Sequence, residues 1–230
     1  MKRFSVDTIC FDYYGTLVDV GEPFVRIRQW FGQRLTARGQ ADSEEAFYYC
    51  FAKRRLKLTA EGKPFLRGAE VLAQSYLHAC RTFAVRGDEE AFRTLLGKLF
   101  TEPPAFREAH EVLSVLRKKW RVGLLTNADN DVLLHSVQRQ GFVPDFICSS
   151  EDLQVNKPQK AFFERAAAQY ALDSRRTLMV GDSLTEDILP AEDMGWHAVL
   201  AARSYPKKPR GICIIENLKD LYGLLSLNGR

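Results

Sequence analysis

The feature that most constrains this chain is the alternation of short apolar runs with segments of helical periodicity. Runs that are apolar on both faces are typical of central parallel strands covered by helices. The alternation therefore predicts an α/β fold with a doubly wound, parallel-sheet (Rossmann-like) core. Five runs are clear and a sixth is weak: TICFD (8–12), RVGLLTN (121–127), DFICSS (145–150), RTLMVGD (176–182), HAVLAA (197–202) and GICIIE (211–216).

One interval, from about Val20 to about Thr101, breaks this alternation because it contains no convincing strand. About 80 residues are too many for a simple crossover between two strands. We therefore predict an inserted helical-bundle cap over residues 20–100 and a core made of residues 1–19 and 101–230, with TEPPAF (101–106) as the return to the core. Three amphipathic patterns support the cap: FVRIRQWFGQRLTARG (24–39), SEEAFYYCFAKRRLKL (43–58) and GAEVLAQSYLHACRTFAV (68–85).

Composition limits the classes of partner and compartment. The 230 residues carry a net charge of +4, which suits a small anionic substrate and is too weak to indicate nucleic acid. No apolar run is long enough for a membrane span or a signal peptide. The five dispersed cysteines read as reduced thiols, so we expect a cytoplasmic protein without a membrane partner. The oligomeric state is left open.

Polar residues gather where the predicted strands end. In an open parallel sheet, ligands bind at the carboxyl ends of the strands, so these residues should meet at one edge. Each has an ordinary structural explanation as a turn, helix-cap or surface residue, but their joint placement favours a functional site. They are Asp12, Thr126, Asn127, Asp182 and, slightly further along the chain, Lys157 and Asp187.

Four short motifs in this order resemble those of the haloacid dehalogenase-like hydrolase superfamily. FDYYGTLVD, starting at Phe11, resembles the first motif, and LLTN, ending at Asn127, resembles the second. NKP, around Lys157, resembles the third, and VGDSLTED, ending at Asp187, resembles the fourth. The long helical insert after the first strand is similar to the subclass whose cap lies there. Because caps and loops vary within a fold, the resemblance indicates a mechanism better than a substrate.

The resemblance implies a role for each of these residues. Asp12 would be the nucleophile that forms an aspartyl intermediate, and Lys157 would supply positive charge. Mg²⁺ would be held by Asp12, Asp182 and the backbone carbonyl of Tyr14, since oxygen ligands suit this ion. Asp187 would orient Ser183, Lys157 or metal-bound water, and Thr126 would hold the non-bridging oxygens of a phosphoryl group. The remaining substrate-binding candidates are Thr16, Asn127 and Ser183.

Tyr14 departs from the pattern of the superfamily's phosphatases, which usually carry a second Asp two residues after the nucleophile. That Asp acts as a general acid and base, and a tyrosine with an ordinary pKa near 10 cannot serve as a base at neutral pH. The D-x-Y-G-T-L pattern is instead similar to that of 2-haloacid dehalogenases, whose halide leaves without a proton. In that alternative, Arg34 or Arg38 of the cap would bind the substrate carboxylate.

The fourth motif favours the phosphatase. Dehalogenases of this family typically have a neutral residue where this chain has Asp182, and they use no metal. Without a metal, Asp182 and Asp187 would leave Asp12 among like charges, with Lys157 as the only nearby cation identified from the sequence, and carboxylate pKa values would rise. We therefore expect a Mg²⁺-dependent phosphatase acting on a small phosphorylated metabolite. A 2-haloacid dehalogenase is the second alternative. Two further alternatives are a catalytically weak phosphate- and Mg²⁺-binding regulatory module and, less favoured, phosphonate cleavage through a cap lysine such as Lys53.

Overall fold

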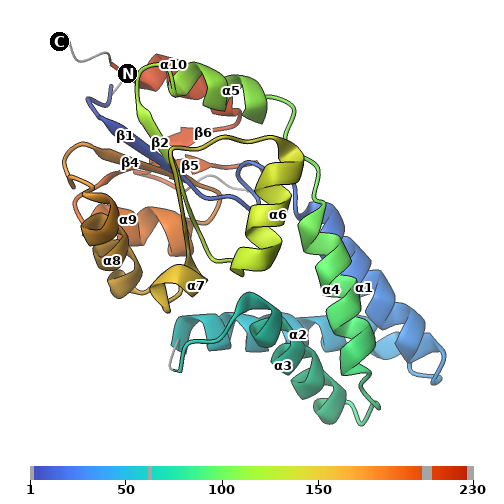
Figure 1. Ribbon diagram of the computed structural model, residues 1–230. Helices are drawn as coiled ribbons and strands as arrows, with labels where there is room; N and C mark the ends of the chain where they lie inside the picture. Colours follow the sequence, from blue (N-terminus) through green and yellow to red (C-terminus); the bar gives the residue numbers. More distant parts are fainter. Residues whose placement is uncertain (1–2, 62–63, 204–208, 227–230) are drawn as a thin grey trace.

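The computed structural model describes residues 3–61, 64–203 and 209–226 (Figure 1). Its sheet is parallel throughout, with the strand order β3-β2-β1-β4-β5-β6. The predicted parallel core is therefore confirmed, and the weak sixth run forms a short edge strand. The strands are β1 (Thr8–Phe11), β2 (Arg121–Thr126), β3 (Phe146–Ser149), β4 (Thr177–Gly181), β5 (His197–Ala201) and β6 (Ile214–Ile215).

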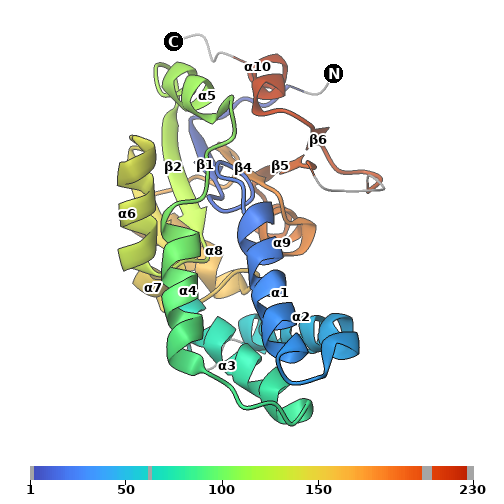
Figure 2. The ribbon, with the colours of Figure 1, turned by 90° about the vertical axis from the view of Figure 1, so that its right-hand side faces the viewer.

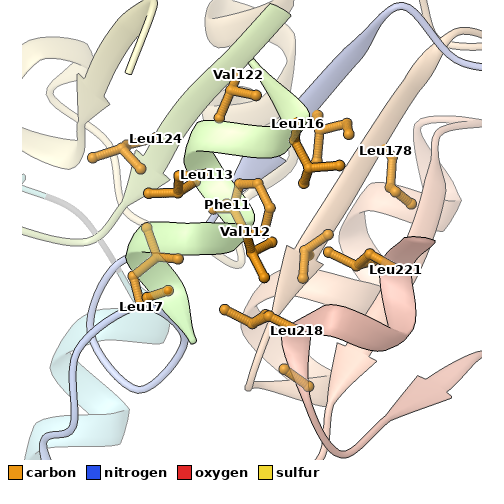
Figure 3. Close-up of a cluster of buried hydrophobic side chains, with 14 of the residues drawn as sticks. Phe11, Leu17, Val112, Leu113, Leu116, Val122, Leu124, Leu178, Leu218 and Leu221 are labelled. Carbon is orange, nitrogen blue, oxygen red and sulfur yellow. The ribbon is translucent and has the colours of Figure 1, made fainter. Parts of the chain in front are cut away.

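Side chains alternate between the two faces of this sheet, as the pleat requires. In β1, Ile9 and Phe11 belong to one buried cluster, whereas Cys10 belongs to the cluster on the opposite face. In β4, Val180 and Met179 divide in the same way. Figure 3 shows part of the first cluster, in which Phe11 and its neighbours meet side chains from the covering helices. Both faces are therefore buried, which is why the strands read as continuous apolar runs.

Helices cover both faces of the core. The first face packs against α5 (Ala109–Leu116), α6 (Asn130–Gln140), the 3₁₀ turn η3 (Leu218–Asp220) and α10 (Leu221–Leu224). The second face packs against α7 (Ser150–Leu153), α8 (Lys160–Tyr170) and α9 (Leu189–Asp193). Gly141 ends α6 in the left-handed conformation (φ 68°), which glycine adopts without strain. The segment before α9 is not regular α-helix but a π-helical turn, η2 (Leu184–Ile188).

A helical insert lies between β1 and β2, and Figure 2 shows its four long helices below the sheet. Its helices are α1 (Gly21–Thr36), the 3₁₀ turn η1 (Ala41–Ser43), α2 (Glu44–Glu61), α3 (Gly68–Thr82) and α4 (Glu89–Thr101). Sequence reasoning named three helical patterns here and missed α4. The sequence does contain a helix-start signal, since Asp88 is a preferred N-cap residue. In the structure, Asp88 caps α4 by accepting a hydrogen bond from Ala91 N at 3.0 Å.

The insert has a hydrophobic cluster of its own, rich in aromatic rings. Phe31 stacks on Tyr76 with ring centroids 5.6 Å apart, and Phe92 lies 4.6 Å from the same tyrosine. Most of the insert's aromatic residues therefore belong to this cluster, although Tyr49 is 67% exposed. Residues 20–100 as a separate cap domain remain a prediction. Among the described residues, no helix is long and apolar enough to cross a membrane.

Candidate functional site

Asp12 lies at the point where the sheet changes direction. The chain runs from β1 outward to β2 and β3, then returns to the other side of β1 to form β4. Phe11 pairs with Leu124 of β2 and with Val180 of β4, so Asp12 sits between the carboxyl ends of both neighbours. Such a switch point is where open α/β sheets bind ligands. The Asp12 side chain is buried, and its main-chain N–H donates to Val180 O at 2.9 Å.

Lys157 brings two of the predicted acids together. Its buried Nζ donates to Asp12 Oδ1 at 2.8 Å, to Asp187 Oδ1 at 2.5 Å and to Leu125 O at 3.0 Å. These contacts use all three ammonium hydrogens. Burial lowers the pKa of Lys157, but the Asp12 and Asp187 carboxylates outweigh it and raise the pKa above its ordinary value. Lys157 is therefore a fixed positive charge beside the candidate nucleophile.

Asp182 follows β4 and packs against the loop after Asp12. The Thr16 hydroxyl donates to Asp182 Oδ1 at 3.3 Å. Gly15 has φ +94°, and a Cβ at that position would lie 2.4 Å from Asp182 Oδ2. Only glycine combines this backbone conformation with so close an approach of the carboxylate. Thr16, which sequence reasoning assigned to substrate, is thus placed where it orients Asp182.

Asp187 is held by the first turn of η2. Its Oδ2 accepts a hydrogen bond from Ser183 N at 3.0 Å, while its Oδ1 accepts the one from Lys157. The Ser183 hydroxyl accepts from Glu186 N at 3.1 Å and so caps the same turn. A Cβ on Gly181 would lie 2.3 Å from Asp187 Oδ2, so this glycine admits the carboxylate to the sheet edge. Asp187 is therefore placed where it orients Lys157, and Ser183 supports Asp187.

The three carboxylates form a strongly charged group. Ligand oxygens of Asp12, Asp182 and Asp187 all lie within 4.8 Å of one another. Burial and then the charges of Asp12 and Asp187 raise the pKa of Asp182 to about 8. Burial raises the pKa of Asp187 to about 7, with Asp12 adding to the rise and Lys157 opposing it. One ammonium faces three carboxylates, which leaves two negative charges uncompensated when all are ionised.

This donor set fits Mg²⁺. The ion prefers oxygen ligands, binds through one or two carboxylates and keeps several of its waters. Asp12 and Asp182 supply carboxylates, and among the described residues no N–H donates to the carbonyl oxygen of Tyr14. A divalent cation would offset the two surplus negative charges, and with them the repulsion that adds to burial in raising the pKa of Asp182.

The side chain of Tyr14 points away from this chemistry. Its hydroxyl donates to the carbonyl oxygen of Phe100, in α4, at 3.1 Å, and its ring meets the Phe100 ring edge-on with centroids 5.9 Å apart. Burial is the largest of the causes that raise the pKa of Tyr14, and nearby acidic groups add to it. Tyr14 thus links the core to the insert and is not poised as a general base.

Thr126 and Asn127 divide into different roles. Thr126 is buried at the end of β2 and lines the pocket, and its hydroxyl has no hydrogen-bond partner among the described residues. It is therefore placed to donate to a ligand. The Asn127 side chain accepts from Lys157 N at 2.8 Å and donates to Lys157 O at 3.0 Å. Asn127 positions the backbone of Lys157, a role that differs from the substrate contact expected from sequence.

A pocket of about 770 Å³ lies between this sheet edge and the insert. Its core side includes Asp12, Thr126, Lys157 and Asp182, so the predicted residues converge on one cavity. The insert contributes apolar and charged side chains from all four long helices. They include Phe24, Arg55, Leu56, Thr59, Glu70, Leu72, Arg93, Leu96 and Phe100.

Sequence reasoning missed a group of polar contacts between the core and the insert, made by Asp129 and Arg67, which we call the clasp. Asp129, three residues after Thr126, accepts hydrogen bonds from Gly68 N at 2.6 Å and Ala69 N at 2.9 Å, at the start of α3. Arg67 adds ion pairs with Asp131 at 2.7 Å and Glu151 at 3.3 Å. No local pattern marks Arg67, and Asp129 reads from sequence as an ordinary loop acid.

Three cap residues considered for the alternative reactions lie elsewhere. Arg34 stacks on the Trp30 ring at 3.4 Å and lies 3.7 Å from Asp88, while Arg38 donates to main-chain carbonyls. Lys53 is exposed. None of the three lines the pocket. The structure therefore gives no support to Arg34 or Arg38 as a carboxylate-binding residue, nor to Lys53 in phosphonate cleavage.

The chain is also similar to known proteins. The profile of a hydrolase family, the haloacid dehalogenase-like hydrolases, matches residues 6–195. A curated relative is the pyrimidine 5'-nucleotidase YjjG of Escherichia coli (strain K12), 28% identical over 141 residues. The match covers 60% of this chain and 61% of YjjG, so it spans less than two thirds of that relative.

Solved structures match over nearly the whole chain. A dehalogenase with an intermediate complex has a TM-score of 0.79 at 21% identity, covering 98% of this chain and 99% of that one. The putative HAD-hydrolase YfnB from Bacillus subtilis, a structure bound to magnesium, has a TM-score of 0.77 at 19% identity, covering 96% and 98%. At these low identities, structural similarity shows the fold alone. The reaction has to be inferred from the residues of the site.

Proposed function

Because the chain belongs to the haloacid dehalogenase-like hydrolases, we propose that it is a Mg²⁺-dependent phosphatase that works through an aspartyl-phosphate on Asp12. Its substrate is a small phosphorylated metabolite held between the sheet edge and the insert. The chain is a hydrolase by family, and the choice of phosphoryl transfer rests on the site described above.

Asp182 is the observation that carries this proposal. Its carboxylate lies in a group of three acids with one ammonium, in the pocket that holds the candidate nucleophile. A halide displacement gains nothing from a second and third carboxylate near Asp12, because like charges disfavour the ionised nucleophile. Phosphoryl transfer needs positive charge around the phosphoryl oxygens, and an acidic cluster recruits it as a cation.

The residues divide the reaction into two displacements. Lys157 holds Oδ1 of Asp12, and no hydrogen bond from the described residues engages Oδ2, which is the oxygen that attacks phosphorus. The bond from phosphorus to the leaving oxygen breaks as the Asp12–phosphorus bond forms. Water then attacks phosphorus, releases inorganic phosphate and restores the Asp12 carboxylate. Thr126 donates to a phosphoryl oxygen as its charge develops, and Lys157 stabilises the same charge as a nearby fixed cation.

Mg²⁺, when bound by Asp12, Asp182 and the Tyr14 carbonyl, would supply the charge neutralisation that lets an anion approach a carboxylate. Lys157 stays protonated throughout, since the adjacent Asp12 and Asp187 raise its pKa despite burial. Tyr14 holds its proton toward Phe100 O, so the leaving group departs with little help from this side chain.

A nucleoside monophosphate is the substrate class that fits best. The pocket's volume of about 770 Å³ lies within the roughly 300–1,000 Å³ typical of small-molecule sites, and it far exceeds the needs of a two- or three-carbon haloacid. Phe24 and Phe100 offer ring faces and edges to a flat base. YjjG is named a pyrimidine 5'-nucleotidase, which supports the same class.

A 2-haloacid dehalogenase is the second candidate, and Tyr14 is the observation that favours it. A halide leaves without a proton, so a tyrosine turned toward Phe100 is no handicap to that reaction. The experiment that separates the two measures phosphate release from uridine 5'-monophosphate and phenyl phosphate, with Mg²⁺ and with a chelator, beside chloride release from 2-chloropropionate. Mg²⁺-dependent phosphate release supports the proposal. Metal-independent chloride release without phosphate release assigns the dehalogenase, and binding without either turnover assigns a regulatory module.

A further inference from the structure

Three arginines of the insert line the pocket, and they differ in how their charge is balanced. Arg67 pairs with Asp131 and Glu151, and Arg93 pairs with Glu70 at 2.6 Å and with Glu89 at 2.7 Å. Arg55, in α2, has no carboxylate within ion-pair distance among the residues that the structure describes. Among the described residues of the insert, Arg55 is therefore the one cation that lines the cavity without a carboxylate partner.

The contact that Arg55 does make fixes its place. Its guanidinium lies over the Phe24 ring, 5.6 Å from the centroid, and the residue is half-buried. A cation over a ring face gains modest stabilisation, and its N–H groups at the edge of the guanidinium plane remain available as donors.

A row of aromatic contacts separates Arg55 from the reacting centre. The Phe24 ring lies 5.8 Å from that of Phe100, and the Phe100 ring lies 5.9 Å from that of Tyr14, two residues beyond Asp12. A substrate whose phosphoryl group meets Asp12 would lay its apolar body along these rings. Its far end would then reach Arg55.

We infer that Arg55 is the specificity-determining residue of the pocket, and that it donates hydrogen bonds to acceptor oxygens at the end of the substrate remote from the phosphoryl group. This inference rests on the proposed phosphatase function. The oxygens belong either to a neutral ring carbonyl or to a second anionic group, and both share the acceptor chemistry that a guanidinium recognises.

The test compares uridine 5'-monophosphate, fructose 1,6-bisphosphate and phenyl phosphate, which has no remote acceptor. In Arg55→Met, kcat/KM for a substrate with the recognised acceptor falls about tenfold or more relative to phenyl phosphate, because a hydrogen bond to a charged donor is lost. If Arg55 donates to a ring carbonyl, the ratio of kcat/KM to that of phenyl phosphate falls for uridine 5'-monophosphate. If Arg55 pairs with a second anionic group, the ratio falls for fructose 1,6-bisphosphate. Arg55→Lys keeps the charge and loses the planar fork, so it restores the bisphosphate alone.

The matched control is Arg54→Met, which removes the same charge from the neighbouring position of α2 without touching the pocket. It should leave both ratios as in wild type. Ratios that stay unchanged in Arg55→Met, or that change equally in Arg54→Met, overturn the inference.

A binding measurement keeps this result separate from the fate of the proposed function. The dissociation constants of uridine 5'-monophosphate and fructose 1,6-bisphosphate are measured by calorimetry with Asp12→Asn, which cannot turn over, and with Asp12→Asn/Arg55→Met. At least one ligand should bind about tenfold more weakly to the double variant. Equal affinities for both ligands overturn the role of Arg55, whereas absence of phosphate release by wild type overturns only the phosphatase.

Discussion

Lys157 Nζ lies 2.8 Å from Asp12 Oδ1 and 2.5 Å from Asp187 Oδ1. One ammonium therefore holds the carboxylate that follows β1 and the carboxylate within η2 in fixed positions. A buried ion pair with good geometry is weak evidence for stability, because desolvation offsets the attraction. Here the ion pair matters because it fixes the positions of the charged groups. The contact sets one oxygen of Asp12 against a permanent charge and leaves the other for substrate.

Magnesium should stabilise the folded protein through Asp182. A ligand present at about 100 times its Kd raises the free energy of unfolding by about 2.7 kcal/mol. We expect the Tm of wild type to rise with Mg²⁺ and that of Asp182→Asn to respond little. Scanning calorimetry with Mg²⁺ and with a chelator checks this. Equal rises in both proteins would show that the ion binds elsewhere.

The metal-free protein should lose stability as the pH rises. In the folded state, the pKa of Asp182 is about 8 and that of Asp187 about 7, whereas both lie near 3.8 in the unfolded chain. Between these values the folded state holds more protons, so the free energy of unfolding falls as the pH rises from about 4 to about 8.

Urea titrations in chelator, at about pH 6 and about pH 8, measure this slope. Asp182→Asn, which cannot ionise at this position, should flatten it, and saturating Mg²⁺ should do the same in wild type by holding the carboxylates ionised. A wild-type slope no steeper than that of Asp182→Asn would contradict the electrostatic account of the cluster.

Tyr14 should make the rate sensitive to the leaving group. The Tyr14 hydroxyl donates its hydrogen bond to Phe100 O, so it does not protonate the leaving group. Phosphate esters should therefore react faster as the pKa of the leaving alcohol falls, with aryl esters ahead of alkyl esters. Tyr14→Asp should raise the alkyl rate most, by up to about 10²-fold, the low end for general acid catalysis.

Tyr14→Phe is the control for this prediction, because it removes only the hydroxyl. It should cost about 1 kcal/mol of stability and leave the ratio of aryl to alkyl rates unchanged. Circular dichroism checks that the variants fold. Equal rates for aryl and alkyl esters in wild type, with chemistry rate-limiting, would mean that another residue is the acid.

Asp129 should hold the insert against the core. Asp129→Ala removes the acceptor for Gly68 N and Ala69 N at the start of α3, a loss of about 1 kcal/mol for a helix cap. We expect faster amide exchange at the start of α3 and a higher KM. Asp131→Ala removes an acid whose side chain is 69% exposed, so it should do much less. Indistinguishable exchange in the two variants would refute the clasp.

The core site was predictable because its residues lie within short motifs attached to strand ends. Asp12, Asp182 and Asp187 each follow or closely follow an apolar run, and parallel strands bring their carboxyl ends to one edge. Glycine spacing adds to this signal, since Gly15 and Gly181 sit where carboxylates approach the backbone. Local sequence therefore carries most of the chemistry.

The insert's contribution was not predictable in the same way. Arg55 and Arg67 read as ordinary surface arginines, and only the packing of the insert on the core brings them to the pocket. The partner of Tyr14, Phe100, lies 86 residues further along the chain. Asn127 looked like a substrate ligand because it ends a strand, but its amide geometry suits the Lys157 backbone better.

Trapping the intermediate tests the central claim most directly. Wild type is mixed with a phosphate ester radiolabelled in its phosphoryl group and with Mg²⁺, quenched in acid during turnover and digested. The label should appear on the peptide that contains Asp12, should be released by hydroxylamine as expected of an acyl phosphate, and should be absent in Asp12→Asn. Phosphate release by wild type with no label on that peptide, or substantial turnover by Asp12→Asn, would contradict aspartyl-phosphate chemistry.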